Sequence, residues 1–182
     1  MRNNRAILVV DLQKEYWPEG GLPLAQIEAA AAQAARVIAH GRGAGDLVVH
    51  IRHELPAGAP VFAAGSDGAE IHPTVAPAAG EPVITKAFPN AFRGTGLQAL
   101  LEARGIEEVV VIGAMSHMCV DATVRAAQDL GFRSVTLHDA CATRDLEFNG
   151  VRVPAAQVQA ALMAALAFAY GEVIATDAFL AR

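Results

Sequence analysis

Three side chains that could together perform nucleophilic catalysis lie soon after short apolar segments of the sequence: Asp11, Lys86 and Cys119. A thiol attacks a carbonyl effectively when a base takes its proton and positive charge stabilises the thiolate. A carboxylate can be that base and can return the proton to a leaving amine, and an ammonium can stabilise developing negative charge. We therefore predict that Cys119 is the nucleophile of a hydrolase that cleaves a carbon–nitrogen bond of the amide type.

Each of these residues has a more common structural role when it is taken alone. An Asp after a strand usually caps a helix, a single Lys is usually a solvated charge, and a lone Cys usually packs as a small hydrophobic residue. Cys119, however, falls near the start of a helix expected over residues 117–130. Free backbone N–H groups and the helix dipole favour negative charge there. The combination, rather than any single residue, predicts a site.

Six short apolar runs alternate with helical patterns along the chain. Strands are expected over residues 6–10, 47–51, 82–85, 109–112, 134–138 and 172–175, and helices over residues 24–40, 97–104, 117–130 and 154–169. The first helix is expected to stop at Gly41, Gly43 and Gly45. Strands that are apolar on both faces and separated by helices form parallel sheets covered on both sides. The sequence predicts one α/β domain over residues 1–182, a Rossmann-like three-layer α/β/α sandwich with a six-stranded, mainly parallel sheet.

The carboxyl ends of the strands are where ligands bind in open α/β sheets. Asp11, Lys86 and the segment leading to Cys119 follow three different strands, so the fold would bring them together there. The connection from residue 53 to residue 81 holds four prolines and four glycines and is long for a compact domain. Such a length favours a functional loop or a partner-binding excursion. Within it, Phe62 is a candidate to close the site of a neighbouring subunit.

Composition and charge argue against several classes of partner. The 182 residues carry a formal net charge of −5 and no basic cluster, which disfavours nucleic acid or an anionic membrane as a partner. No apolar stretch approaches the ~20 residues of a membrane span, and the first apolar run is too short for a signal peptide. Two cysteines make no disulfide framework, so a reducing cytoplasm is expected. Hydrophobic residues, many of them alanine, make up 53% of the chain and leave room for a subunit contact.

Three sequence blocks together resemble the isochorismatase-like cysteine hydrolases, a family that includes nicotinamidases, carbamoylsarcosine amidohydrolases and streptothricin hydrolases. The blocks are residues 8–13 (LVVDLQ), 83–92 (VITKAFPNAF) and 111–120 (VIGAMSHMCV), in the order and spacing of the family. The resemblance implies a catalytic triad of Asp11, Lys86 and Cys119. It also implies a cis peptide bond between Ala114 and Met115, which would turn the Met115 N–H toward the same point as the Cys119 N–H. Two such donors would form an oxyanion hole.

The predicted reaction passes through a thioester of Cys119 with a small amide or carbamoyl substrate. The candidates for substrate binding are Gln13, Trp17, Phe92, His117 and Phe148. Nicotinamidases hold a metal with an Asp-x-His pair and a further His, but this chain has Arg52 and His53 in the corresponding region. We therefore predict no metal and no cofactor. The family commonly forms dimers or tetramers, so a homodimer or homotetramer is expected.

Three other interpretations stay open at this point. An isochorismatase-type enzyme would cleave a vinyl ether, although true isochorismatases typically lack the Cys of this motif. A thiol-based redox protein would use Cys119 and Cys141 as a pair. A non-catalytic binding protein would keep only the fold, and the presence of Asp11, Lys86 and Cys119 counts against it.

Overall fold

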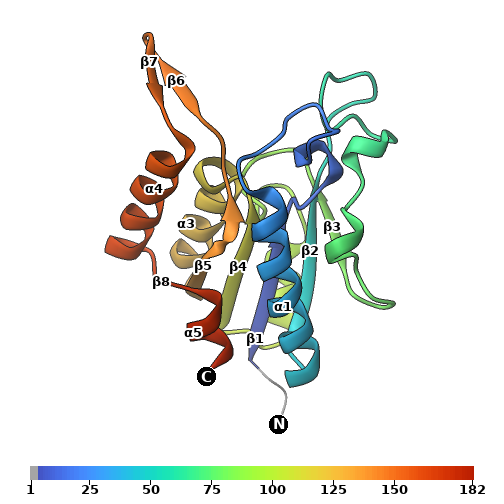
Figure 1. The fold of residues 1–182 in the computed structure, drawn as a ribbon. Helices are drawn as coiled ribbons and strands as arrows, with labels where there is room; N and C mark the ends of the chain where they lie inside the picture. The colour runs from blue at the N-terminus through green and yellow to red at the C-terminus, as the bar shows by residue number, and fades with distance from the viewer. Residues whose placement is uncertain (1–3) are drawn as a thin grey trace.

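A six-stranded sheet forms the middle of the molecule in a computed structural model that describes residues 4–182 (Figure 1). The first three residues of the predicted domain lie outside the described residues. The strands are β1 (Arg5–Val10), β2 (Leu47–His53), β3 (Val83–Lys86), β4 (Glu108–Ala114), β5 (Arg133–Ala142) and β8 (Glu172–Ile174). They lie in the order β3-β2-β1-β4-β5-β8, and every neighbouring pair is parallel. The predicted α/β class and strand number are confirmed.

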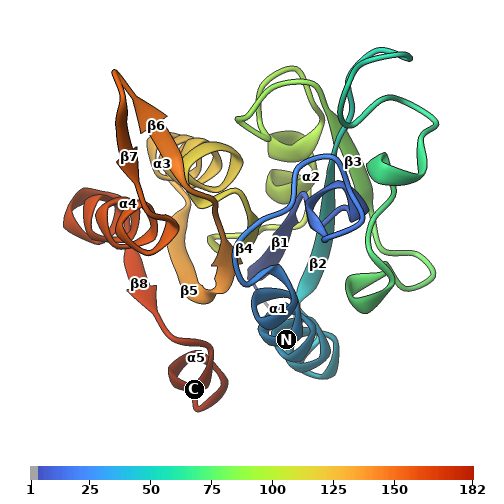
Figure 2. The same ribbon diagram turned by 45° about the horizontal axis from the view of Figure 1, so that its top comes forward.

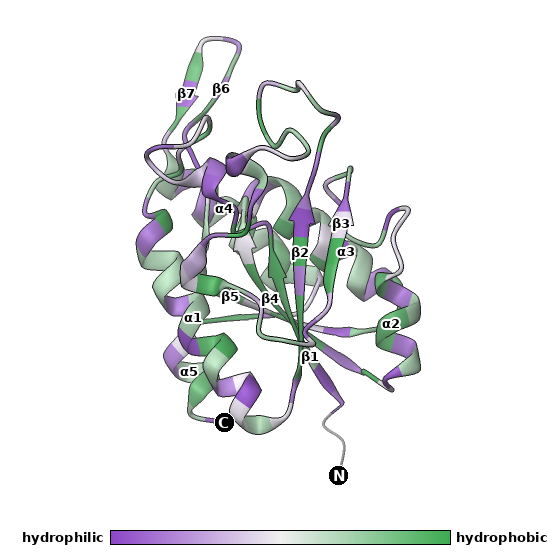
Figure 3. Ribbon diagram, turned by 90° about the vertical axis from the view of Figure 1, so that its right-hand side faces the viewer, coloured by the Kyte–Doolittle hydropathy of each residue, from purple (hydrophilic) through white to green (hydrophobic). Residues whose placement is uncertain are grey.

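Helices cover both faces of this sheet and complete three layers. On one face, α1 (Ile27–Ala44) and α5 (Thr176–Leu180) contribute to a core cluster with side chains of the sheet. On the other face, α2 (Leu97–Ala103), α3 (Asp121–Asp129) and α4 (Ala155–Ala169) contribute to a second cluster. Figure 3 shows β4 coloured mainly as hydrophobic, as expected for a strand buried on both sides. No helix among residues 4–182 is both long and apolar enough to cross a membrane.

The first helix ends later than the sequence predicted. Gly41 and Gly43 lie inside α1, and the helix ends only at Gly45, which has a left-handed φ of +79°. Packing explains Gly41, because a Cβ there would lie 2.1 Å from Ile7 Cδ1 of β1. The glycine therefore lets the helix approach the sheet rather than stopping it.

The order of the strands reverses between β1 and β4. The chain runs from β1 outward to β3 on one side, and then from β4 outward to β8 on the other. The two strands approach closely at Gly113, where a Cβ would lie 2.0 Å from Val10 O and where φ is +129°. Such a reversal of strand order is the usual ligand-binding position of an open α/β sheet.

Several short elements above the sheet were not predicted. They are the antiparallel hairpin of β6 (Leu146–Phe148) and β7 (Val151–Val153), the 3₁₀ turns η1 (Lys14–Tyr16), η2 (Asp67–Ala69) and η3 (Pro73–Val75), and the π-helical turn η4 (Ser116–Val120). The hairpin projects from the body of the molecule (Figure 1). Figure 2 shows the segments after β1 and β2 side by side, where Lys14 N donates to Glu70 O and His72 N donates to Leu12 O.

The outer part of the sheet is shorter than its neighbours. β8 pairs only with residues 135–137 of β5, although β5 continues to Ala142. The last residues of β5 therefore have no strand on that side among the described residues.

Candidate active site

The structure brings Asp11, Lys86 and Cys119 into direct contact. Asp11 follows β1, Lys86 is the last residue of β3, and Cys119 lies in the η4 turn after β4. The Lys86 ammonium donates to Asp11 Oδ2 at 2.6 Å and to Cys119 Sγ at 3.2 Å. All three residues are buried. The strand ends thus place a thiol, a carboxylate and an ammonium in one buried cluster.

Asp11 is held in an unusual backbone conformation. Its φ is +49°, a left-handed value that non-glycine residues seldom adopt, although Asp tolerates it better than most. Its N–H donates to Ile51 O, and its own carbonyl accepts from Gln13 N. Its Oδ1 is buried and has no hydrogen-bond partner among the described residues. Uncommon backbone conformations and unpaired buried polar atoms of this kind gather at functional sites.

The electrostatics of the cluster keep the thiol protonated at rest. Burial raises the pKa of Cys119 well above that of an ordinary thiol, and the Asp11 charge raises it further, although Lys86 acts in the opposite direction. Burial also raises the pKa of Asp11, and Lys86 partly offsets this. The expected stabilisation of a thiolate at a helix start is therefore outweighed. Cys119 is a buried residue of the η4 turn, and α3 begins only at Asp121.

His53, at the end of β2, is a fourth member of the cluster. Its Nδ1 lies 3.1 Å from Lys86 Nζ. Burial, followed by the Lys86 charge, lowers the pKa of His53 to about 4, so the imidazole is neutral near pH 7. Asp11, His53 and Cys119 offer ligand-type atoms within 4.8 Å of one another. The Lys86 ammonium contacts all three residues and already supplies a positive charge among them.

Gln13 is fully occupied by the protein backbone. It is buried, its amide nitrogen donates to His53 O and Ala69 O, and its amide oxygen accepts from His53 N. Instead of leaving a group for substrate, as the sequence suggested, this side chain ties the end of β2 to the η2 turn.

The four other candidates for substrate binding lie in different surroundings. Trp17 is buried and stacks on His72 with ring centroids 3.7 Å apart. His117 is half-buried beside the nucleophile, with Nδ1 2.7 Å from Thr143 Oγ1. Both remain candidates.

The other two predicted wall residues differ in exposure. Phe92 is partly buried, packs against the hydrophobic cluster that includes Cys119, and stacks on Phe132 with centroids 6.0 Å apart. Phe148 is 76% exposed on the β6–β7 hairpin. Both stay candidates for the wall of the site.

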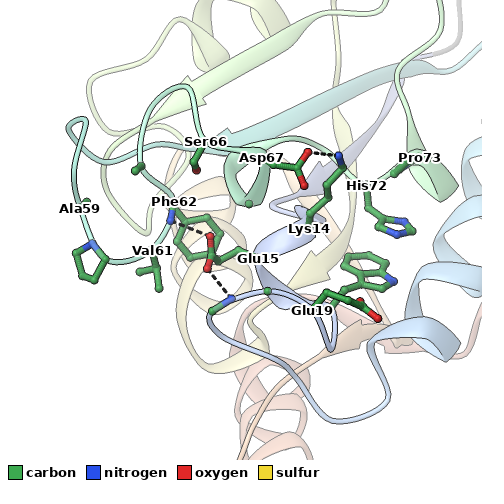
Figure 4. A pocket seen from close by; sticks show the side chains of 16 residues that line it. Lys14, Glu15, Glu19, Ala59, Val61, Phe62, Ser66, Asp67, His72 and Pro73 are labelled. Carbon is green, nitrogen blue, oxygen red and sulfur yellow. Dashed lines mark hydrogen bonds and ion pairs between the residues drawn. The ribbon is translucent and has the colours of Figure 1, made fainter.

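A pocket of about 490 Å³ lies between the segments that follow β1 and β2 (Figure 4). Its wall includes Trp17, Glu19 and Phe62. Phe62 has little exposed surface and packs edge-on against Tyr16 and His53 of its own chain, with centroids 5.1 and 5.5 Å apart. Within its own chain Phe62 thus packs beside His53, and its predicted part in closing the site of a neighbouring subunit stays a prediction.

The Glu15 carboxylate fixes the position of Phe62. It is buried, and it accepts from Gly21 N at 2.7 Å and from Phe62 N at 3.2 Å (Figure 4). The lack of side chains at Gly21 and Gly68 makes room for it, since Cβ atoms there would lie 2.3 and 2.1 Å from its oxygens. Neither Glu15 nor Phe62 carried a sequence signal for this contact. His53 lies two residues after the second expected strand, at the sheet edge where site residues are expected.

These features define a Rossmann-like α/β protein with a buried cysteine–carboxylate–lysine cluster at its strand reversal. The family model of the isochorismatase domain matches residues 5–177, and the chain belongs to this family. It is 43% identical over 176 residues to the isochorismatase family protein YddQ of Bacillus subtilis, covering 96% of this chain and 98% of YddQ. It is 34% identical over 154 residues to maleamate amidohydrolase of Pseudomonas putida, covering 76% and 72%. A crystal structure from Oleispira antarctica, described as an isochorismatase hydrolase, has a TM-score of 0.97 and 49% identity over 100% of this chain and 98% of that one.

Proposed function

We propose that this chain is a cysteine amidohydrolase that cleaves a non-peptide carbon–nitrogen bond of a small molecule through a thioester. The observation that carries the proposal is the Lys86 ammonium, which contacts both the Asp11 carboxylate and the Cys119 thiol in a buried site. Asp11, Lys86 and Cys119 are the proposed catalytic triad. The relative from Pseudomonas putida is named for an amidohydrolase activity, which supports an amide or carbamoyl substrate.

Proton transfer starts the proposed reaction. Asp11 takes the proton of the Cys119 thiol as the sulfur attacks the carbonyl carbon, and the buried Oδ1 of Asp11 has no protein partner that competes for this proton. Lys86 stabilises the negative charge as it passes between sulfur and carboxylate. A base in contact with the thiol is required because the thiol is protonated at rest.

Collapse of the tetrahedral intermediate then expels the amine. The carbon–nitrogen bond breaks, Asp11 returns its proton to the leaving nitrogen, and the acyl group remains on Cys119 as a thioester. Water, deprotonated by Asp11, attacks the thioester, and the acid product leaves while the thiol regains its proton. The balance is one water consumed for one acid and one ammonia or amine released.

The backbone N–H groups of Met115 and Cys119 are the proposed oxyanion hole. The peptide bond between Ala114 and Met115 is cis; Met115 joins β4 to the η4 turn, and Cys119 lies within that turn. Donors of this kind stabilise the oxyanion without reorganisation, and loss of one typically costs about 100-fold or more in rate.

We further propose a cytoplasmic location and a homodimer or homotetramer. Both cysteines are free, which suits a reducing compartment. Phe148 and Phe168 expose 76% and 92% of their surface, on the hairpin and on α4. Large exposed apolar side chains of this kind are typical of contact surfaces. Sedimentation of the purified chain at several concentrations tests the oligomer, and a monomer throughout would contradict it.

Comparison of Cys119→Ala with Cys141→Ala tests the proposed function. Both cysteines are buried, but only Cys119 contacts Lys86. Ammonia or amine release is measured over a panel of amides, carbamoyl compounds and lactams, and mass spectrometry detects the acyl-enzyme on Cys119. We expect loss of turnover in Cys119→Ala and near-normal turnover in Cys141→Ala. Turnover that survives in Cys119→Ala refutes the thioester mechanism, and a Cys119–Cys141 disulfide under mild peroxide would favour the redox interpretation.

A further inference from the structure

We infer that His53 is a positioning residue of the same site, where its Nδ1 lone pair accepts the third N–H of the Lys86 ammonium. This inference rests on the proposed function, because it assigns His53 a part in holding the catalytic lysine. It extends the triad to four residues, each supplied by a different strand end.

The hydrogen-bond capacity of Lys86 supports this assignment. A lysine ammonium has three N–H donors and no acceptor. The Lys86 side chain has no exposed surface, so water supplies no partner. Its three acceptors are Asp11 Oδ2 at 2.6 Å, His53 Nδ1 at 3.1 Å and Cys119 Sγ at 3.2 Å. Because each donor has one acceptor, the direction of the ammonium is fixed, and loss of His53 would leave one N–H of a buried cation unpaired.

His53 must be neutral at Nδ1 to accept this hydrogen bond. The surroundings favour that form, because burial and the adjacent Lys86 charge both lower the pKa of His53. His53 is also held in place at both its backbone and its ring. Gln13 binds the His53 backbone N–H and carbonyl, and Phe62 packs edge-on against the imidazole with an interplanar angle of 86°. These contacts direct Nδ1 toward Lys86 rather than toward solvent.

The direction of the Lys86 ammonium is the property that His53 maintains. An unpaired N–H on a buried ammonium is costly, so the head group would move toward another acceptor if His53 were lost. A displaced Lys86 would stabilise neither the Asp11 carboxylate nor a Cys119 thiolate. His53 therefore acts through Lys86 and does not itself need to touch the substrate.

Two substitutions of similar shape separate the lone pair from the packing of the ring. His53→Asn keeps an acceptor, since Asn Oδ1 takes the place of Nδ1, and His53→Leu puts a methyl group there. The readout is the rate at which iodoacetamide alkylates Cys119 without substrate, followed from pH 6 to 10 by peptide mass spectrometry. We expect His53→Leu to slow alkylation about 10- to 100-fold and His53→Asn to stay within about threefold of wild type. His40→Leu serves as the control, because His40 packs on Phe179 of α5 and not on Lys86.

The outcomes distinguish this inference from the proposed function. Equal rates in wild type and His53→Leu, or equal slowing in both variants, would overturn the lone-pair role. If His53→Leu does not fold, nitrogen-15 NMR of histidine-labelled wild type replaces it, and a protonated Nδ1 between pH 6 and 8 would overturn the inference. Alkylation of Cys119 needs no substrate, so its rate tests the role of His53 independently of turnover. Turnover that survives in Cys119→Ala would refute the proposed function and leave the alkylation results unchanged.

Discussion

Substitution of Glu15 by Gln should destabilise the protein by about 2–3 kcal/mol, although the side chain keeps its size. The carboxylate accepts two backbone N–H groups at a residue with only 6% of its surface exposed. A Gln side chain offers one oxygen, so its NH₂ group would face one of these donors and leave it unpaired. Hydrogen bonds to charged groups contribute about 1.5–3 kcal/mol, and an unsatisfied buried donor costs a similar amount.

Gly68→Ala perturbs the same carboxylate from the opposite side. Its Cβ would lie 2.1 Å from Glu15 Oε2, so the carboxylate or the η2 turn must move. We expect a cost of about 2 kcal/mol in the wild type and a much smaller cost in a Glu15→Ala background, where the clashing oxygen is absent. Coupled neighbours show such non-additivity, of about 0.5–3 kcal/mol.

Urea denaturation at pH 7 measures each free energy of unfolding, with the slope m as the check that the denatured state is unchanged. Glu19→Gln is the control, because Glu19 lines the same pocket but is exposed, so the change should stay within about 0.5 kcal/mol. The reasoning fails if Glu15→Gln and Glu19→Gln have equal effects, or if Gly68→Ala costs as much without Glu15 as with it.

Three further outcomes follow from other parts of the structure. Gly43→Ala should stabilise the protein by about 0.5–1 kcal/mol in urea denaturation, because Gly43 lies inside α1 with no atom near its Cβ position; destabilisation would contradict this. Hydrogen bonds from Arg42, the largest cause, lower the pKa of Glu81 from 4.5 to about 2. A lowered folded pKa stabilises above the unfolded value, so Glu81→Gln should cost about 1–2 kcal/mol at pH 7, and this difference should vanish as the pH falls from 4.5 toward 2. Because burial and Asp11 raise the pKa of Cys119, its alkylation by iodoacetamide should be slower than that of free cysteine at pH 7 and should still rise above pH 9; a plateau below pH 8 would argue against it.

The sequence could predict the sheet, and with it the approach of Asp11, Lys86 and Cys119. Short continuous apolar runs are typical of buried strands and locate them, and parallel strands bring their carboxyl ends to one edge. The end of α1 was mispredicted because a glycine inside a helix can serve close packing, as Gly41 does against Ile7. Sequence patterns report the period of an element but not its distance from a neighbour.

The wall of the site was harder to predict than the cluster. The sequence marks Phe92 and Phe148 alike as aromatic candidates, yet Phe92 is partly buried against the core and Phe148 stands exposed on the hairpin. Gln13 follows Asp11 closely in sequence, but contacts with residues 40 and 56 positions away determine its role. Such contacts depend on the path of the long loop, which carries no periodic signal.

The short length of β8 has a consequence for self-association. Because β8 pairs only with residues 135–137, the rest of β5 presents main-chain groups that another strand could bind. Two hydrogen bonds occupy carbonyl groups at or next to this edge: the Gln159 amide of α4 donates to His138 O, and Ala25 N donates to Thr143 O. Helix α4 and the segment that precedes α1 thus bind two of these main-chain groups and leave fewer of them for edge-to-edge pairing with another chain.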